Sequence, residues 1–116
     1  MKNNQVGWFE IYVQNMSRAK LFYENVFKTK LSELKFPGME MWAFPMDQKL
    51  YGAPGALVKI EGFTSGGNST LVYFTCDDCA IEEQRASAHG GKIFKGKFSI
   101  GEHGFISLVT DTEGNM

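Results

Sequence analysis

Apolar residues fill most positions of the chain from Val6 to Val13, and aromatic and β-branched residues dominate this run. This composition predicts a β-strand, in which successive side chains point to opposite faces. The side chains of the two faces are Phe9, Ile11 and Val13 on one side and Trp8, Glu10 and Tyr12 on the other. Glu10 is unusual because it is an acid in a segment that otherwise resembles a buried strand.

The hydrophobic period changes after Val13. Apolar residues then recur at i, i+3, i+4 and i+7, the spacing of an amphipathic helix: Ala19, Phe22, Tyr23 and Val26. Asn15 or Ser17 can cap the start of this helix. We expect its apolar stripe to cover the strand face that carries Phe9, Ile11 and Val13.

The same order, a strand followed by a helix, returns in the second half of the chain. "STLVYFTCDD" predicts a strand, Asp77 or Asp78 can cap a following helix that runs to His89, and Gly90-Gly91 ends it. Without gaps, Trp8 aligns with Leu71 at an offset of 63 residues, and Glu10 then aligns with Tyr73. The chain therefore reads as two copies of one unit.

Further strands separated by glycine-bearing turns follow each helix: "KLSELKF", "MEMWAFP" and "GALVKIEG" in the first copy, "GKIFKGKFSI" and "GFISLVTD" in the second. The prediction is an α+β fold of two βαβββ modules that form one curved mixed sheet, with a cup on the Glu10 side. The last strand would begin near Met116. We expect a single domain over residues 1–116, with module one at 5–62, a hinge at 63–69 and module two at 70–116.

Composition narrows the class of protein. The 116 residues carry a formal charge of −1, and no run of Lys and Arg forms a basic stripe, so we expect no nucleic-acid partner. The amino-terminal segment has no apolar core of a signal peptide, and no run is long enough to span a membrane. We therefore expect a cytoplasmic protein. Cys76 and Cys79 have C-x-x-C spacing, but the intervening aspartates oppose thiolate formation, which favours a structural role.

In these features the chain resembles the vicinal oxygen chelate superfamily, which includes glyoxalase I, bleomycin-resistance proteins and extradiol dioxygenases. The resemblance lies in "WFEIYVQNMSRAKLFYENVF", "LVYFTCDDC", "HGGKIF" and "DTEGN". It is nearest to the bacterial subgroup described as "predicted enzyme related to lactoylglutathione lyase". The resemblance implies a small-molecule ligand and a homodimer.

Metal-dependent relatives bind one divalent ion through four inward side chains. The resemblance places two of these positions at Trp8 and Leu71, which cannot ligate a metal. Glu61 is the oxygen-bearing candidate for the third position, and the fourth would lie beyond Met116. We expect the standard metal site to be lost and assign no metal ligand or cofactor, although a divalent metal bound in another way stays open.

Two functions remain open. In the first, the protein is a glyoxalase-like lyase or isomerase related to lactoylglutathione lyase, with Glu10 as its general base. In the second, it is a metal-free protein that binds or sequesters a flat or cationic small molecule, as bleomycin-resistance proteins do. The candidate substrate-binding residues in either case are Trp8, Tyr12, Trp42, Tyr73 and His103.

Overall fold

The computed structural model describes residues 4–47, 49–67 and 69–116, which contain seven β-strands and two α-helices. The chain divides into two compact units, Met1–Thr75 and Cys76–Met116. Each unit combines one helix with a sheet, so the predicted α+β class is confirmed.

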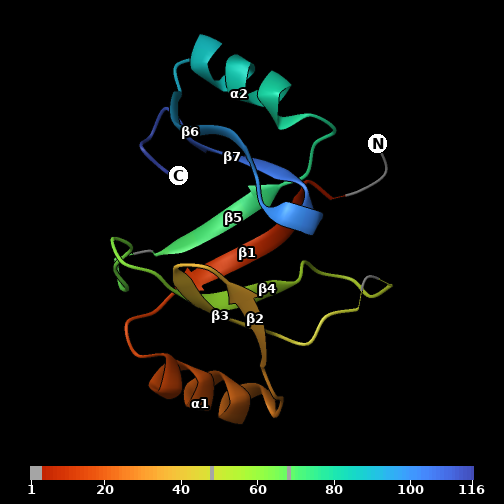
Figure 1. The fold of residues 1–116 in the computed structure, drawn as a ribbon, viewed down its shortest axis with the longest axis vertical. Coiled ribbons are helices and arrows are strands. Elements are labelled where there is room, and N and C mark those ends of the chain that lie inside the picture. The colour runs from red at the N-terminus through yellow and green to blue at the C-terminus, as the bar shows by residue number, and fades with distance from the viewer. Residues whose placement is uncertain (1–3, 48, 68) are drawn as a thin grey trace. The chain divides into compact units, whose positions relative to one another are not determined.

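The first unit is a βαβββ module followed by one more strand (Figure 1). Its elements are β1 (Val6–Tyr12), α1 (Met16–Phe27), β2 (Ser32–Phe36), β3 (Met39–Ala43), β4 (Gly55–Lys59) and β5 (Thr70–Phe74). The strands form one mixed sheet in the order β2-β3-β4-β1-β5. β1 and β4 run parallel, and the other neighbours are antiparallel.

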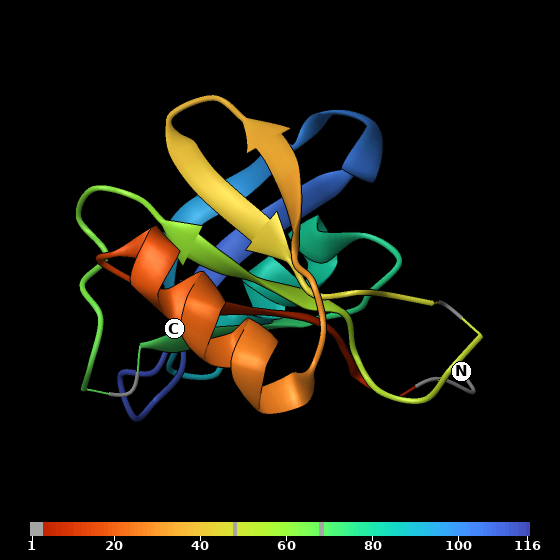
Figure 2. The same cartoon turned by 90° about the horizontal axis from the view of Figure 1, so that it is seen from below.

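The helix covers one face of this sheet (Figure 2). The hydrophobic core here is a cluster of four buried side chains, Val13, Met16, Leu31 and Leu57. Ile11 and Tyr23 pack against this cluster. The α1 amino terminus is capped by Asn15, whose Oδ1 accepts a hydrogen bond from the Arg18 backbone N–H at 3.0 Å. Of the predicted apolar stripe, Ala19 and Tyr23 pack against this core, whereas Phe22 and Val26 are exposed.

The register of the sheet fixes which residues share the other face. Glu10 lies opposite Ala56 on β4 and Leu71 on β5, and Trp8 lies opposite Tyr73. Side chains of directly paired residues point to the same side of a sheet. The face away from α1 therefore carries Trp8, Glu10 and Tyr12 with Leu71 and Tyr73, as the alternation predicted.

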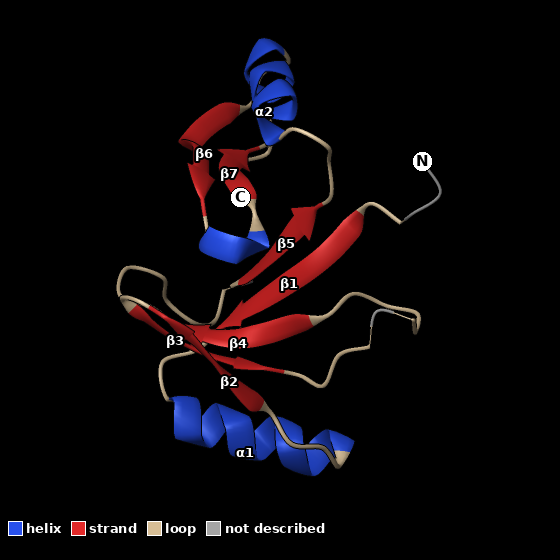
Figure 3. Cartoon of the chain, turned by 45° about the vertical axis from the view of Figure 1, so that its right-hand side comes forward, coloured by secondary structure: helices blue, strands red, loops and turns tan. Residues whose placement is uncertain are grey.

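The second unit contains α2 (Cys79–Ala88), β6 (Lys92–Ser99), a short 3₁₀ turn η1 (Gly101–His103) and β7 (Phe105–Thr110). β6 and β7 form an antiparallel two-stranded sheet, and α2 packs on both strands (Figure 3). Asp78 caps α2 by accepting a hydrogen bond from the Ala80 N–H at 3.0 Å. Gly90, with φ of 97°, ends the helix region in a conformation that favours glycine.

The two copies expected from the sequence meet along β1 and β5. These strands pair antiparallel, and Phe9 lies opposite Val72, its counterpart at the predicted offset. β5 therefore belongs to the sheet of the first unit, and the division between units falls after Thr75. A single domain with module boundaries at 62 and 70 stays a prediction, as does the hinge at 63–69, whose residue Asn68 lies outside the described residues.

Candidate functional site

A buried carboxylate, Glu10 on β1, lies on the sheet face opposite α1. Glu10 is 8% exposed and accepts hydrogen bonds from three side chains. Trp8 Nε1 donates to Oε2 at 3.1 Å, while the Tyr12 hydroxyl at 2.5 Å and the Tyr73 hydroxyl at 3.2 Å both donate to Oε1. We call these four residues, Trp8, Glu10, Tyr12 and Tyr73, the Glu10 cluster.

Local sequence and strand pairing together build this cluster. Trp8, Glu10 and Tyr12 share one face of β1 because they are two residues apart. Tyr73 joins them because β5 pairs antiparallel with β1 and places it opposite Trp8. The Tyr73 hydroxyl donates to Glu10, the residue 63 positions earlier that aligns with Tyr73 in the repeat.

Glu10 accepts hydrogen bonds at both carboxylate oxygens. Among the described residues, no buried side-chain nitrogen or oxygen lacks a hydrogen-bond partner. A carboxylate offers about four lone-pair positions, and three donors occupy three of them. Because the indole and both phenols act as donors, Glu10 is held as their common acceptor.

The protein raises the pKa of both phenols in the cluster. Burial is the main cause at Tyr12, followed by its hydrogen bond to the negative Glu10. Burial also raises the pKa of Tyr73, and the charge of Glu10 adds to the effect. Both phenols therefore stay neutral hydrogen-bond donors at physiological pH.

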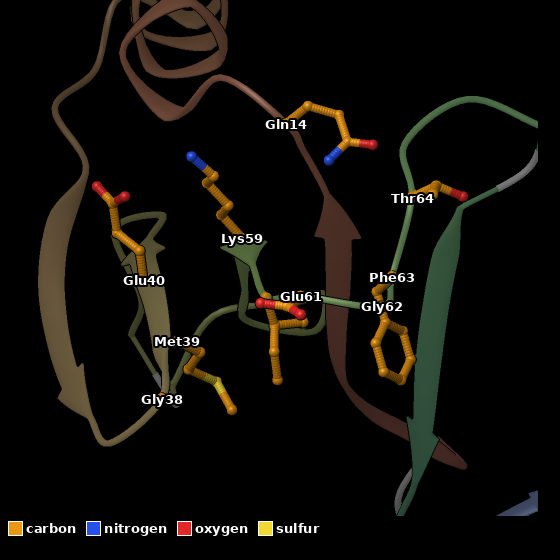
Figure 4. A pocket seen from close by; sticks show the side chains of 10 residues that line it. Gln14, Gly38, Met39, Glu40, Lys59, Glu61, Gly62, Phe63 and Thr64 are labelled. Carbon is orange, nitrogen blue, oxygen red and sulfur yellow. The ribbon is translucent and has the colours of Figure 1, made fainter.

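Phe63 extends the cluster at the Tyr12 end. Its ring stacks on Tyr12 with centroids 5.0 Å apart and planes 26° apart. Phe63 also lines an open hollow beyond the carboxyl ends of β1 and β4 (Figure 4). The sequence did not identify Phe63, because it lies in a glycine-rich loop without a periodic pattern.

Trp42 is not part of the Glu10 cluster. It lies opposite Leu57 on β4 and packs against the core under α1. The Lys20 ammonium group lies 3.3 Å from the centroid of the Trp42 ring. Its Nε1 donates to Glu40 at 3.1 Å. The register therefore places Trp42 on the opposite face of the sheet from Glu10.

His103 is an exposed residue of η1 in the second unit. The four residues of the Glu10 cluster all belong to the first unit. The role of His103 in binding a substrate stays a prediction.

The C-x-x-C pair lies at the start of the second unit. Cys76 is exposed and Cys79 begins α2, and both thiols are free. Partial loss of water around the thiol and the nearby Glu82 carboxylate raise the pKa of Cys76. A raised pKa opposes thiolate chemistry, in line with the effect expected from neighbouring acids.

The usual metal of related folds does not fit the residues at these positions. Trp8 presents an indole N–H, which is only a donor and is bonded to Glu10, and Leu71 is a buried aliphatic side chain. Glu61 follows β4 and lines the hollow. In the part of the chain that the structure describes, no three His, Cys, Asp or Glu side chains gather closely enough to hold a metal ion.

Sheet topology and the repeated βα unit define a class of small α+β proteins, and comparison with known proteins identifies the family. Residues 5–116 match the family model of the Glyoxalase/Bleomycin resistance protein/Dioxygenase superfamily. The chain belongs to this superfamily, which confirms the family resemblance seen in the sequence.

Comparison with solved structures and with curated proteins does not identify a function. Among solved structures, a mutant of glyoxalase I from Zea mays matches with 16% sequence identity and a TM-score of 0.41. The match covers 94% of this chain and 43% of the maize chain, so the chain spans less than half of that protein. No curated protein matches the chain. Within residues 4–47, 49–67 and 69–116, no helix is both long and apolar enough to cross a membrane.

Proposed function

We propose that the protein is a small-molecule-binding member of its superfamily that recognises its ligand without the usual metal. The observation that supports this most is the Glu10 carboxylate, which accepts hydrogen bonds from Trp8, Tyr12 and Tyr73. Two of the positions where relatives hold a metal carry Trp8 and Leu71 instead. Recognition then depends on hydrogen bonding, stacking and charge rather than on chelation.

The chemistry of the cluster favours a flat or cationic ligand. Trp8 and Tyr73 are partly exposed and paired across neighbouring strands, so their rings offer a surface for stacking. The negative charge of Glu10 lies directly behind them. A cation over an aromatic face near a carboxylate gains from both interactions.

The first test is calorimetric titration with the flat cation proflavine, in buffer with and without EDTA. We expect saturable binding that EDTA does not change, and binding about tenfold weaker in Glu10→Gln, because the charge is lost while the shape is kept. Glu33→Gln is the matched control, since Glu33 is an exposed carboxylate on β2 paired with Lys35.

Two outcomes would contradict this proposal. Binding that EDTA abolishes would show that a metal is required. Equal loss of affinity in Glu10→Gln and Glu33→Gln would show only a general effect of charge. Thermal unfolding of both variants separates lost binding from lost fold.

A glyoxalase-like lyase or isomerase reaction is the second candidate. The observation in its favour is that the three donors leave one lone-pair direction of the buried Glu10 carboxylate for a substrate proton. The hemithioacetal of methylglyoxal and glutathione is the substrate to assay. Turnover that Glu10→Gln abolishes and Glu33→Gln leaves intact would establish this activity in place of simple binding.

We also propose that the protein is a cytoplasmic homodimer and that residues 1–116 act as one domain. The supporting observation for a dimer is that β5 is an edge strand of the five-stranded sheet. An open strand edge favours pairing with another chain.

A further inference from the structure

An open hollow of about 570 Å³ lies beyond the carboxyl ends of the parallel strands β1 and β4. Figure 4 shows side chains from three parts of the first unit around it: Gln14 after β1, Met39 and Glu40 at the start of β3, and Lys59 to Thr64 at and after the end of β4. A volume of this size is typical of small-molecule sites. Trp8, Leu71 and Tyr73 do not lie in its lining, whereas Glu61, the candidate for the third metal position, does.

Charges of opposite sign lie side by side on one wall. Glu40 on β3 is directly opposite Lys59 on β4, and both side chains are exposed. Residues paired in this way have Cβ atoms roughly 5 Å apart. In Figure 4 their charged ends extend in the same direction. This spacing suits a ligand that carries a positive and a negative group close together.

The two charged groups differ in the interactions that they already make within the protein. Glu40 accepts a hydrogen bond from Trp42 Nε1 at 3.1 Å, which orients its carboxylate. Its other cross-strand neighbour, Lys35, is paired with Glu33 at 3.1 Å. The ion pairs formed by the described residues do not include Lys59. Its ammonium group is therefore available to a ligand carboxylate.

Two apolar side chains also line the hollow, Met39 on β3 and Phe63 in the loop after β4 (Figure 4). Stacking on Tyr12 positions the Phe63 ring. The Phe63 loop is also tied to the end of β1, because the Ser65 N–H donates to Gln14 Oε1 at 3.1 Å. An apolar group can therefore pack on a positioned aromatic ring.

We propose that this hollow is a second binding site, and that its ligand is a small zwitterion with an apolar group, the chemistry of a free amino acid with an apolar side chain. Lys59 binds the ligand carboxylate, Glu40 binds its ammonium group, and Phe63 with Met39 packs on the apolar part. Binding here does not require the function proposed for the Glu10 cluster, although Phe63 stacks on Tyr12 of that cluster.

The test is NMR titration of ¹⁵N-labelled protein with L-phenylalanine, 2-phenylethylamine and 3-phenylpropionate. The last two probes each lack one of the charged groups. The protein has two tryptophans, and Trp8→Phe assigns their indole signals. We expect phenylalanine to shift the indole N–H signal of Trp42, which donates to Glu40, and to leave that of Trp8 in place.

Variants identify the groups that bind. We expect each single-charge probe to bind about threefold more weakly than phenylalanine, and Lys59→Met and Glu40→Gln to weaken phenylalanine binding by a similar factor. Lys30→Met is the control, because Lys30 is an exposed lysine at the opposite end of β2 from the Gly38 turn. It should leave binding unchanged.

Three results would overturn the proposal. The first is no saturable shift with phenylalanine. The second is equal binding of the three probes together with no effect of Lys59→Met. The third is a shift of the Trp8 signal instead of the Trp42 signal, which would place the ligand at the Glu10 cluster.

Discussion

Glu10 is a buried carboxylate whose three hydrogen-bond donors are all aromatic side chains. A buried carboxylate is costly unless donors replace the water that it loses. Trp8, Tyr12 and Tyr73 supply those donors. The cluster is therefore both a structural element of the sheet and the feature on which the proposed recognition depends.

The first residue-scale prediction concerns the Tyr12 hydroxyl. Tyr12→Phe removes a donor that is 2.5 Å from Glu10 and leaves the carboxylate underbonded. We expect the free energy of unfolding to fall by about 1–3 kcal/mol in urea denaturation. Tyr51→Phe is the control, because Tyr51 is fully exposed, and it should change stability by less than about 0.5 kcal/mol. Equal effects of the two variants would contradict the role of the cluster.

The second residue-scale prediction concerns high pH. Folding raises the pKa of Tyr12 and Tyr73 above the ordinary value of 10.0, so the native state keeps protons that the unfolded chain releases. Stability from these groups is fully present below pH 10 and is lost as the pH rises further. Urea unfolding at several pH values above 10 should show a decline that is smaller in the Tyr12→Phe/Tyr73→Phe double variant. An identical decline in both proteins would refute this assignment.

Sequence alone predicted that the four residues of the Glu10 cluster lie on one sheet face, whereas their role in binding stays a prediction. Alternation placed Trp8, Glu10 and Tyr12 on one face, and the 63-residue offset paired Tyr73 with Glu10. Trp42 could not be placed in the same way, because its neighbours Met41 and Ala43 are also apolar and alternation leaves both faces equivalent. The contribution of Phe63 depends on a loop conformation that periodicity does not predict.

At the scale of elements, the two helices and seven strands of the described residues were all expected from the sequence, with most ends shifted by one or two residues and the ends of β4 and β5 by three and four. The further strand expected near Met116 is not among the described elements. The capping residues correctly predicted where the helices begin, since Asn15 caps α1 and Asp78 caps α2. The neighbours of each strand were harder to predict. The hydrogen-bonded pairing of β5 with β1 depends on contacts far apart in sequence, which local patterns do not encode.

An element-scale prediction tests the contact between β1 and β4. A methyl group added at Gly55 would overlap the Phe9 ring, which lies over this glycine and contacts Phe44. We expect Gly55→Ala to lower the unfolding free energy by about 1–3 kcal/mol, because the ring must move. At Gly96 the nearest atom to the added methyl is 3.6 Å away, so Gly96→Ala is the control. Similar stability of both variants would be inconsistent with this packing.

At the scale of the whole molecule, the family assignment rests on residues 5–116, nearly the entire chain. Families with this fold perform many reactions, so membership alone does not select one. The sequence predicted the family because the order of strands, helices and turns is preserved in both halves. It could not identify the ligand, because recognition depends on a few side chains whose contacts form only in the folded chain.

A whole-molecule prediction concerns assembly. We expect sedimentation equilibrium to give twice the 13.0 kDa mass of one chain, because the β5 edge offers unpaired backbone groups. Val72→Lys adds a charge to the exposed apolar face of this edge strand and should shift the equilibrium toward the monomer. A single-chain mass across the micromolar range would contradict the dimer.

The central claim is that Glu10 serves as a hydrogen-bonded recognition group and not as part of a metal site. The most direct measurement is calorimetric titration of metal-stripped protein with Ni²⁺ and Zn²⁺, repeated with Glu10→Gln. The account predicts no stoichiometric binding of either ion that depends on Glu10. Tight binding of one ion per chain that Glu10→Gln abolishes would contradict it.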